Sequence, residues 1–130
     1  MPTPIDPGSL RVDDDGVTLL GGWSPSSGHR HFPMRPLCPF TGADDVQPLD
    51  LPRDGRVWLW TTVTAPPPGY QGPVPYGLGI VELDGEPFLR VVSRIIGEVP
   101  GEGAPVRLVG EEVPGPDGDP ATTWAFQVVP

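Results

Sequence analysis

The sequence predicts an all-β protein, and three observations lead to this prediction. Short apolar runs with a period of two lie between clusters of glycine and proline, as in strands joined by tight turns. Glycine and proline number 18 and 21 of 130 residues, which leaves no window for a convincing amphipathic helix. The length suits one domain of ordinary size with a compact core.

We divide the chain into three parts. Residues 1–20 are expected to form an N-terminal arm, because prolines and the acidic run Asp13–Asp15 favour a solvated or partner-dependent segment, with one short apolar run at 17–20. Residues 21–50 are rich in turns. Residues 51–130 contain the remaining strands.

The clearest strand is 56–64, where β-branched and aromatic residues alternate. Its aliphatic row, Val57, Leu59, Thr61 and Val63, is expected on one face, and Trp58 and Trp60 are expected on the other. Further strands are predicted at 76–83, 88–96, 106–113 and 122–129. Five strands with a longer connection at 97–105 predict a five-stranded OB-like barrel, with a short sandwich as the alternative. Closure of a barrel hides the edges that an open sheet exposes.

Two turns in residues 21–50 have the layout of a zinc ribbon, in which two pairs of ligands three residues apart face each other across a hairpin. The four corresponding positions are Ser24, Ser27, Cys38 and Thr41. Hydroxyl groups do not hold zinc at neutral pH, so one competent ligand remains of four. The sequence therefore predicts a degenerate zinc-ribbon-like hairpin segment without structural zinc, and no other cofactor.

A metal site built from His29, His31 and Cys38 is the alternative for this segment. Two histidines two residues apart on a strand share a face, but no fourth ligand is evident. Under the main hypothesis, apolar side chains pack in the place of the metal: Phe32, Met34, Leu37 and Phe40.

The formal net charge is −9 and the chain contains no lysine, which argues against nucleic-acid binding by a general positive field. The acidic balance suits docking onto a basic partner. The single cysteine allows no internal disulfide, and no apolar run has the length of a signal core or a membrane span. These features predict a cytoplasmic protein without membrane contact.

The sequence contains no evident nucleophile–base pair, so we expect no enzymatic activity of its own. Its acidic residues concentrate in turns, where carboxylates bond to nearby amides. Arg90 and Arg94 share a strand face and are candidates for a partner's carboxylates or for CoA phosphates; pairing with Glu82 or Glu111 is the alternative. Trp58 and Trp60 mark either an interaction surface or a core. The loop 66–75 offers Tyr70 for a flat amphipathic contact.

Several short motifs resemble those of the acyl-CoA-associated OB-fold proteins, domain of unknown function family 35, in which a rubredoxin-like zinc ribbon precedes an OB barrel. Each motif is weak alone, but their order and spacing across residues 20–115 are fairly specific. The motifs are Gly28, Phe32-Pro33-x-Arg35-Pro36-x-Cys38-Pro39, Gly55-x-Val57-x-x-Trp60-Thr61, Pro66-Pro67-Pro68-Gly69-Tyr70, Pro75-Tyr76 and Val81-Glu82-Leu83-Asp84.

The resemblance implies a non-catalytic partner subunit of a thiolase-like acyl-CoA enzyme, such as a thiolase, an aldolase or an acyltransferase of lipid or polyketide metabolism. In that family the barrel helps to shape the acyl-CoA site, so contact with CoA is expected, and the ribbon supports subunit contact. The partner- or ligand-binding candidates are then Tyr70, Trp58, Trp60, Arg90, Arg94 and Arg35. A stand-alone OB-fold module for a small ligand or single-stranded nucleic acid is the alternative function.

Overall fold

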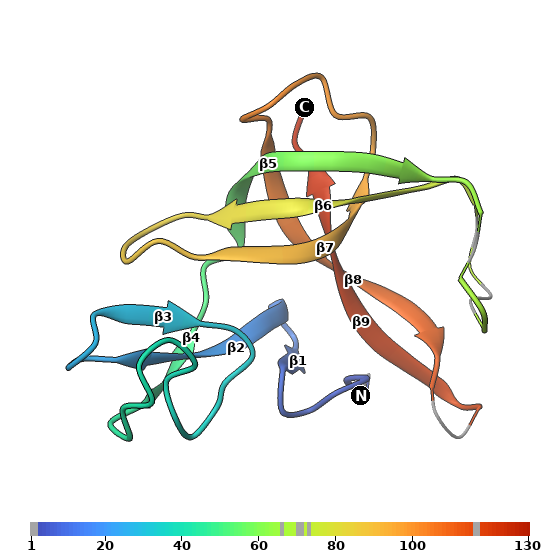
Figure 1. Ribbon diagram of the computed structural model, residues 1–130. Helices are drawn as coiled ribbons and strands as arrows, with labels where there is room; N and C mark the ends of the chain where they lie inside the picture. Colours follow the sequence, from blue (N-terminus) through green and yellow to red (C-terminus); the bar gives the residue numbers. More distant parts are fainter. Residues whose placement is uncertain (1–2, 66, 70–71, 73, 116–117) are drawn as a thin grey trace.

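The computed structural model describes residues 3–65, 67–69, 72, 74–115 and 118–130, and these residues contain strands and no helix (Figure 1). The strands are β1 (Leu10–Asp13), β2 (Gly16–Ser24), β3 (His29–His31), β4 (Gln47–Asp50), β5 (Asp54–Val63), β6 (Tyr76–Leu83), β7 (Arg90–Ile96), β8 (Pro105–Pro114) and β9 (Pro120–Val128). The all-β prediction is confirmed. All five predicted barrel strands are present, with ends that differ by two residues or fewer.

Strands β5 to β9 form a closed barrel in the order β5-β6-β7-β9-β8, with β8 returning to β5. This confirms the five-stranded OB-like barrel and excludes the sandwich. The long connection between β7 and β8 arises because β9 lies between them. Here β9 runs parallel to β7, and the register pairs only Ile95 with Phe126 and Ile96 with Gln127. The β8–β9 ladder is far longer, from Val106–Val128 to Pro114–Pro120.

The N-terminal residues differ from the solvated arm expected at 1–20. Strand β1 pairs with the first half of β2, and β2 continues through residue 20 to pair with β3 and β4. Leu10 is only 1% exposed. The amide of Ile5 donates to the Thr122 carbonyl of β9 at 2.8 Å, and the Thr122 amide donates to the Thr3 carbonyl at 2.7 Å. The prolines of this segment obscured an apolar pattern that is long enough to reach the core.

One hydrophobic core serves both the N-terminal sheet and the barrel. Leu10, Val17 and Leu19 belong to the same buried cluster as Val57 and Phe126 of the barrel. Phe32, just after β3, also meets Trp124 of β9 edge to face, with ring centroids 5.5 Å apart. The two parts of the chain are therefore packed on each other.

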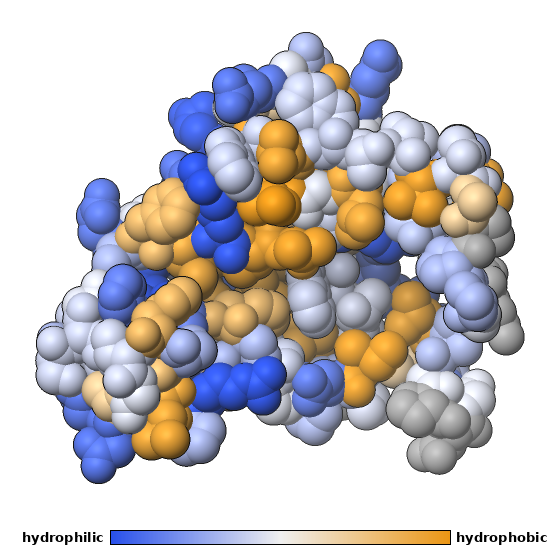
Figure 2. Space-filling model, viewed as in Figure 1, coloured by the Kyte–Doolittle hydropathy of each residue, from blue (hydrophilic) through white to orange (hydrophobic). Residues whose placement is uncertain are grey.

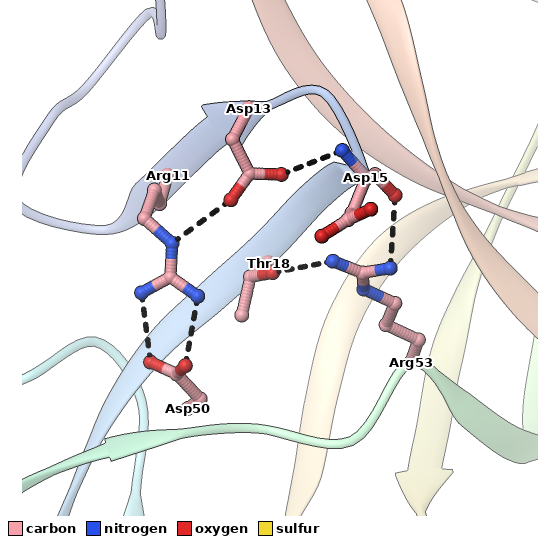
Figure 3. Close-up of polar contacts among 6 residues, drawn as sticks. All are labelled: Arg11, Asp13, Asp15, Thr18, Asp50 and Arg53. Atoms are coloured by element: carbon pink, nitrogen blue, oxygen red, sulfur yellow. Dashed lines mark hydrogen bonds and ion pairs between the residues drawn. The ribbon is translucent and has the colours of Figure 1, made fainter.

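Polar side chains hold the N-terminal sheet together at its surface (Figure 3). Arg11 of β1 donates two hydrogen bonds to Asp50 of β4, at 3.1 and 2.7 Å, across the intervening β2. The hydrogen bond and the charge of Arg11 lower the pKa of Asp50 against an opposing effect of burial. Arg53, between β4 and β5, donates to the Thr18 hydroxyl and the Asp15 carbonyl, each at 2.9 Å.

A buried arginine links the ribbon part, residues 21–50, to the barrel. Arg30 of β3 is 4% exposed, and its guanidinium donates to three carbonyls of the β6–β7 turn, those of Asp84, Gly85 and Pro87. Burial lowers its pKa, which the charge of Glu86 partly offsets. Because the three acceptors are all on one turn, this side chain fixes where β3 meets the barrel.

Candidate interaction surface

A bulge in β5 decides which side chains this strand presents to solvent. Val57 pairs with Val81, but Leu59 pairs with Ile80, so Trp58 is an extra residue in β5. Bulges of this kind re-aim the side chains that follow. Val57 remains inside at 1% exposure, whereas Leu59 is 53% exposed. The prediction that Val57, Leu59, Thr61 and Val63 share one face is therefore wrong, because simple alternation does not reveal the extra residue.

The bulge completes an apolar row on the outer face of the barrel. Leu59 of β5, Ile80 of β6 and Val92 of β7 are directly paired across the three strands, and we call them the apolar row. Val92 is 64% exposed and Leu59 53%. They line a shallow groove of about 390 Å³ whose other walls are Trp60, Thr61, Leu78 and Gly79. Figure 2 shows apolar side chains gathered over β5–β7 on this face.

A cation–aromatic cluster flanks one end of the apolar row. The Arg90 guanidinium lies 3.5 Å from the Trp58 ring centroid and 4.5 Å from that of Phe88. Its Nε also forms an ion pair with Glu82 at 3.3 Å. Phe88 is 55% exposed. Arg90 thus holds Trp58 in place, and this end of the face has aromatic surface with a neutralised charge.

A cleft of about 590 Å³ lies at the other end, lined by residues that include Trp60, Tyr76, Arg94 and Val99. The Arg94 guanidinium donates to Glu111 at 2.9 Å and lies 5.8 Å from the Tyr76 ring centroid. Both ends of the face therefore match the alternative considered from sequence, in which Arg90 and Arg94 pair with Glu82 and Glu111. Such a face offers apolar and aromatic contact with little net charge.

The sequence-predicted candidates fall in three places. Trp58, Trp60, Arg90 and Arg94 gather around the apolar row; Trp58 is half-buried and Trp60 is 43% exposed, so neither is a core tryptophan. Tyr70 lies outside the described residues. Arg35 is exposed in the loop after β3.

Sequence reasoning missed the apolar row itself. The sequence analysis placed Leu59 on the same face as Val57 and did not single out Ile80. Val92 did carry a signal, because the period of two places it on the same strand face as Arg90 and Arg94. An aliphatic residue in that position is unusual for a solvated face.

The alternative metal site at His29, His31 and Cys38 receives no support. His31 is 2% exposed, and its Nε2 accepts a hydrogen bond from the Arg35 amide at 3.3 Å. Burial lowers the His31 pKa, which favours the neutral ring. His29 is exposed and lies against Phe40, with ring centroids 4.8 Å apart. Within the described part of the chain, no group of three or more His, Cys, Asp or Glu residues is placed to hold a metal ion.

Comparison with known proteins gives consistent results. A family model described as the ChsH2 C-terminal OB-fold domain matches residues 49–111. A DUF35 domain-containing scaffold protein of Pyrococcus furiosus is 31% identical over 113 residues, which cover 86% of this chain and 82% of the relative. The solved structure of the Ltp2-ChsH2(DUF35) aldolase is similar with a TM-score of 0.63 and 26% identity, over 85% of this chain and 84% of that chain. Both longer matches extend beyond the barrel.

Proposed function

This chain belongs to the DUF35 family of OB-fold proteins, and we propose on this basis that it is a non-catalytic subunit of a thiolase-like acyl-CoA enzyme. Its role is to assemble the complex and to help shape the acyl-CoA site. The name of the Pyrococcus furiosus relative, a scaffold protein, supports this role. So does the name of the similar solved structure, which joins a DUF35 component and Ltp2 in an aldolase.

The observation that carries the proposal is the apolar row, in which Leu59 and Val92 are exposed and Ile80 is half-buried between them. Exposed apolar surface that forms a contiguous patch marks interaction sites. The row crosses the first three strands of the barrel and so includes the second and third, which form the face with which OB folds bind their ligands. Its charged neighbours are already paired, so a partner need not supply compensating charge there. This is the composition expected at the centre of a protein–protein interface.

We further propose that the chain itself contacts part of the bound acyl-CoA. The cleft beside Trp60 contains one guanidinium, that of Arg94, and Glu111 neutralises it. We therefore expect the partner enzyme to bind the CoA phosphates. Trp60, Tyr76 and Val99 are then available to contact uncharged parts of the acyl-CoA, and Tyr70 and Arg35 remain candidates for partner contact.

We also propose that the protein is located in the cytoplasm and does not contact a membrane. The acyl-CoA enzyme proposed as partner supports it, and so does the single cysteine, Cys38, which is a free thiol. In the described part of the chain, no helix has the length and apolar character needed to cross a membrane.

Affinity capture from native lysate, followed by mass spectrometry, tests the function. We expect a thiolase-fold enzyme to be retained, and its acyl-CoA turnover to fall when this chain is removed. Turnover by the purified chain alone, or capture that contains no thiolase-fold protein, would contradict the proposal.

The interface is tested with matched valine variants and the purified complex. Val92→Asp places a charge in the apolar row and should weaken association about 30-fold or more, as for an interface hot spot. Val129→Asp introduces the same charge at another exposed valine, 38% exposed near the C-terminus, and should leave association unchanged. Equal binding by both variants would place the interface elsewhere.

A further inference from the structure

Two turns of the ribbon part have the same backbone and face each other. They are residues 24–28 and 38–42, and each ends in a glycine with positive φ, 72° at Gly28 and 78° at Gly42. In each, the glycine amide donates to the carbonyl of the first residue, Ser24 or Cys38, at 2.8 Å. Zinc ribbons present ligands from the first and fourth positions of two such turns. The two turns therefore share the spacing, the closing hydrogen bond and the final positive-φ glycine.

The side chains at the four ligand positions converge. The Ser24 and Ser27 hydroxyl oxygens lie 3.0 Å apart, and Ser27 shares a hydrogen bond with the Thr41 hydroxyl of the opposite turn. Burial would raise the pKa of the Cys38 thiol, but the neighbouring Thr41 and Ser27 hydroxyls and the amides of Phe40 and Thr41 lower it. We call the residues at the four ligand positions the hydroxyl–thiol cluster. Ser24 and Cys38 are 0% and 2% exposed, whereas Ser27 is half-buried and Thr41 is exposed, so the cluster reaches from the interior to the surface.

A carboxylate secures the first turn from outside the cluster. Asp45 accepts a hydrogen bond from the Ser24 hydroxyl at 2.6 Å and one from the Ser26 amide at 2.8 Å. Of the apolar side chains predicted to pack in place of the metal, Leu37 and Phe40 are 51% and 60% exposed, and Phe32 packs against the core and Trp124. The hydrogen bond between Ser27 and Thr41 connects the two turns.

The cluster does not fit zinc. Zinc sites in proteins use sulfur, imidazole nitrogen and carboxylate oxygen, and here the four positions provide one sulfur and three neutral hydroxyls. The nearest carboxylate, that of Asp45, is occupied by the first turn. A zinc ion would also need room among hydroxyls that already bond directly to each other.

We propose that the hydroxyl–thiol cluster replaces the zinc of a ribbon as the link between its two turns, while the turns keep the geometry of a tetrahedral metal site. Two consequences follow. The natural protein folds without metal, and restoration of three sulfurs restores zinc binding without any change of backbone. This inference concerns the ribbon alone and does not depend on the proposed partner.

The first test restores the ligands. The variant Ser24→Cys, Ser27→Cys, Thr41→Cys should bind one zinc per chain, and its Co²⁺ form should show the intense visible absorption of tetrahedral thiolate coordination. The matched control moves one substitution by a single residue, Ser24→Cys, Ser26→Cys, Thr41→Cys, and should lose that spectrum. Equal tetrahedral binding by the control, or a folded triple variant without it, would overturn the retained geometry.

The second test uses the natural cluster and does not require the triple variant to fold. EDTA should leave the thermal unfolding of the natural protein unchanged, and zinc should be sub-stoichiometric after purification in zinc-containing medium. Thr41→Val removes the bridging hydroxyl at nearly constant shape and should accelerate hydrogen exchange at the Gly28 and Gly42 amides, whereas Thr41→Ser should not. Stoichiometric zinc in the natural protein, or equal exchange in both variants, would refute the replacement.

Discussion

At the residue scale, Arg30 has the largest structural role that the sequence did not reveal. It lies between two histidines that draw attention to metal binding, and nothing in its neighbours indicates three carbonyl acceptors on a distant turn. Such acceptors depend on how the barrel packs, which sequence periodicity does not encode. The two turns at 24–28 and 38–42 were predictable, because the spacing that marks them is local.

We expect Arg30→Met to lower the free energy of unfolding by about 2–4 kcal/mol, because it removes three partly buried hydrogen bonds to one turn. Urea unfolding monitored by tryptophan fluorescence measures this. Arg56→Met is the control: Arg56 is exposed and donates to one carbonyl, that of Gly103 at 3.0 Å, so its cost should stay below about 0.5 kcal/mol. A similar decrease in the free energy of unfolding for both variants would show that Arg30 does not hold residues 21–50 against the barrel.

The Arg11–Asp50 pair predicts a pH dependence. The pKa of Asp50 is lowered in the folded chain. The Arg11–Asp50 pair therefore stabilises the folded state fully at pH values above the ordinary aspartate pKa of about 3.9, and this contribution is lost as the pH falls through the lowered pKa. Asp50→Asn should therefore cost stability at neutral pH, by the small amount expected of an exposed pair. The difference between the two proteins should vanish under acid conditions. Urea unfolding at several pH values checks this, and a difference that grows in acid contradicts it.

At the scale of elements, the barrel strands were predictable and the bulge was not. The alternation of 56–64 and the glycine–proline clusters around it defined β5 within two residues. The register shift at Trp58 arises from pairing with β6, and a single strand contains no signal of it. Strand β3 was indicated only as the place of two histidines in a hairpin, and β4 was missed, since each is formed by pairing with β2 rather than by its own propensity.

Gly79 of β6 provides a test of the packing beside the bulge. A methyl group at this position would lie 2.4 Å from the Leu59 carbonyl oxygen and 2.5 Å from Cδ1 of Ile95. We expect Gly79→Ala to lower the free energy of unfolding by about 1–3 kcal/mol, as overpacking does. Gly101→Ala, where nothing lies within 4 Å, should be nearly neutral. The test is to compare the thermal unfolding of Gly79→Ala and Gly101→Ala. Equal stability of the two variants would mean that β5 and β6 move apart easily.

At the scale of the whole molecule, charge and apolar surface point to the same kind of partner. The net charge is −9, while the charges that border the apolar row are paired locally. The acidic surface does not favour the phosphate backbone of nucleic acids. The apolar face favours a protein surface of similar character.

Salt titrations separate these two kinds of partner. Association with a thiolase-fold enzyme should change by less than about threefold between roughly 0.05 and 0.5 M salt, because few unpaired charges meet at the apolar row. A labelled single-stranded oligonucleotide should not bind the purified chain at low salt in fluorescence anisotropy. Oligonucleotide binding that weakens as salt rises would instead favour the stand-alone OB module.

The closure of the barrel has a consequence for its motions. Strands β7 and β9 are joined through two residue pairs, at Ile95 and Ile96, whereas the neighbouring ladders are much longer. Local opening begins where the fewest hydrogen bonds must break together. The same two isoleucines line the cleft beside Trp60. We therefore expect local opening of the barrel at the β7–β9 pairing, which also lines that cleft. A molecule bound in the cleft should then slow the hydrogen exchange of the amides in this pairing.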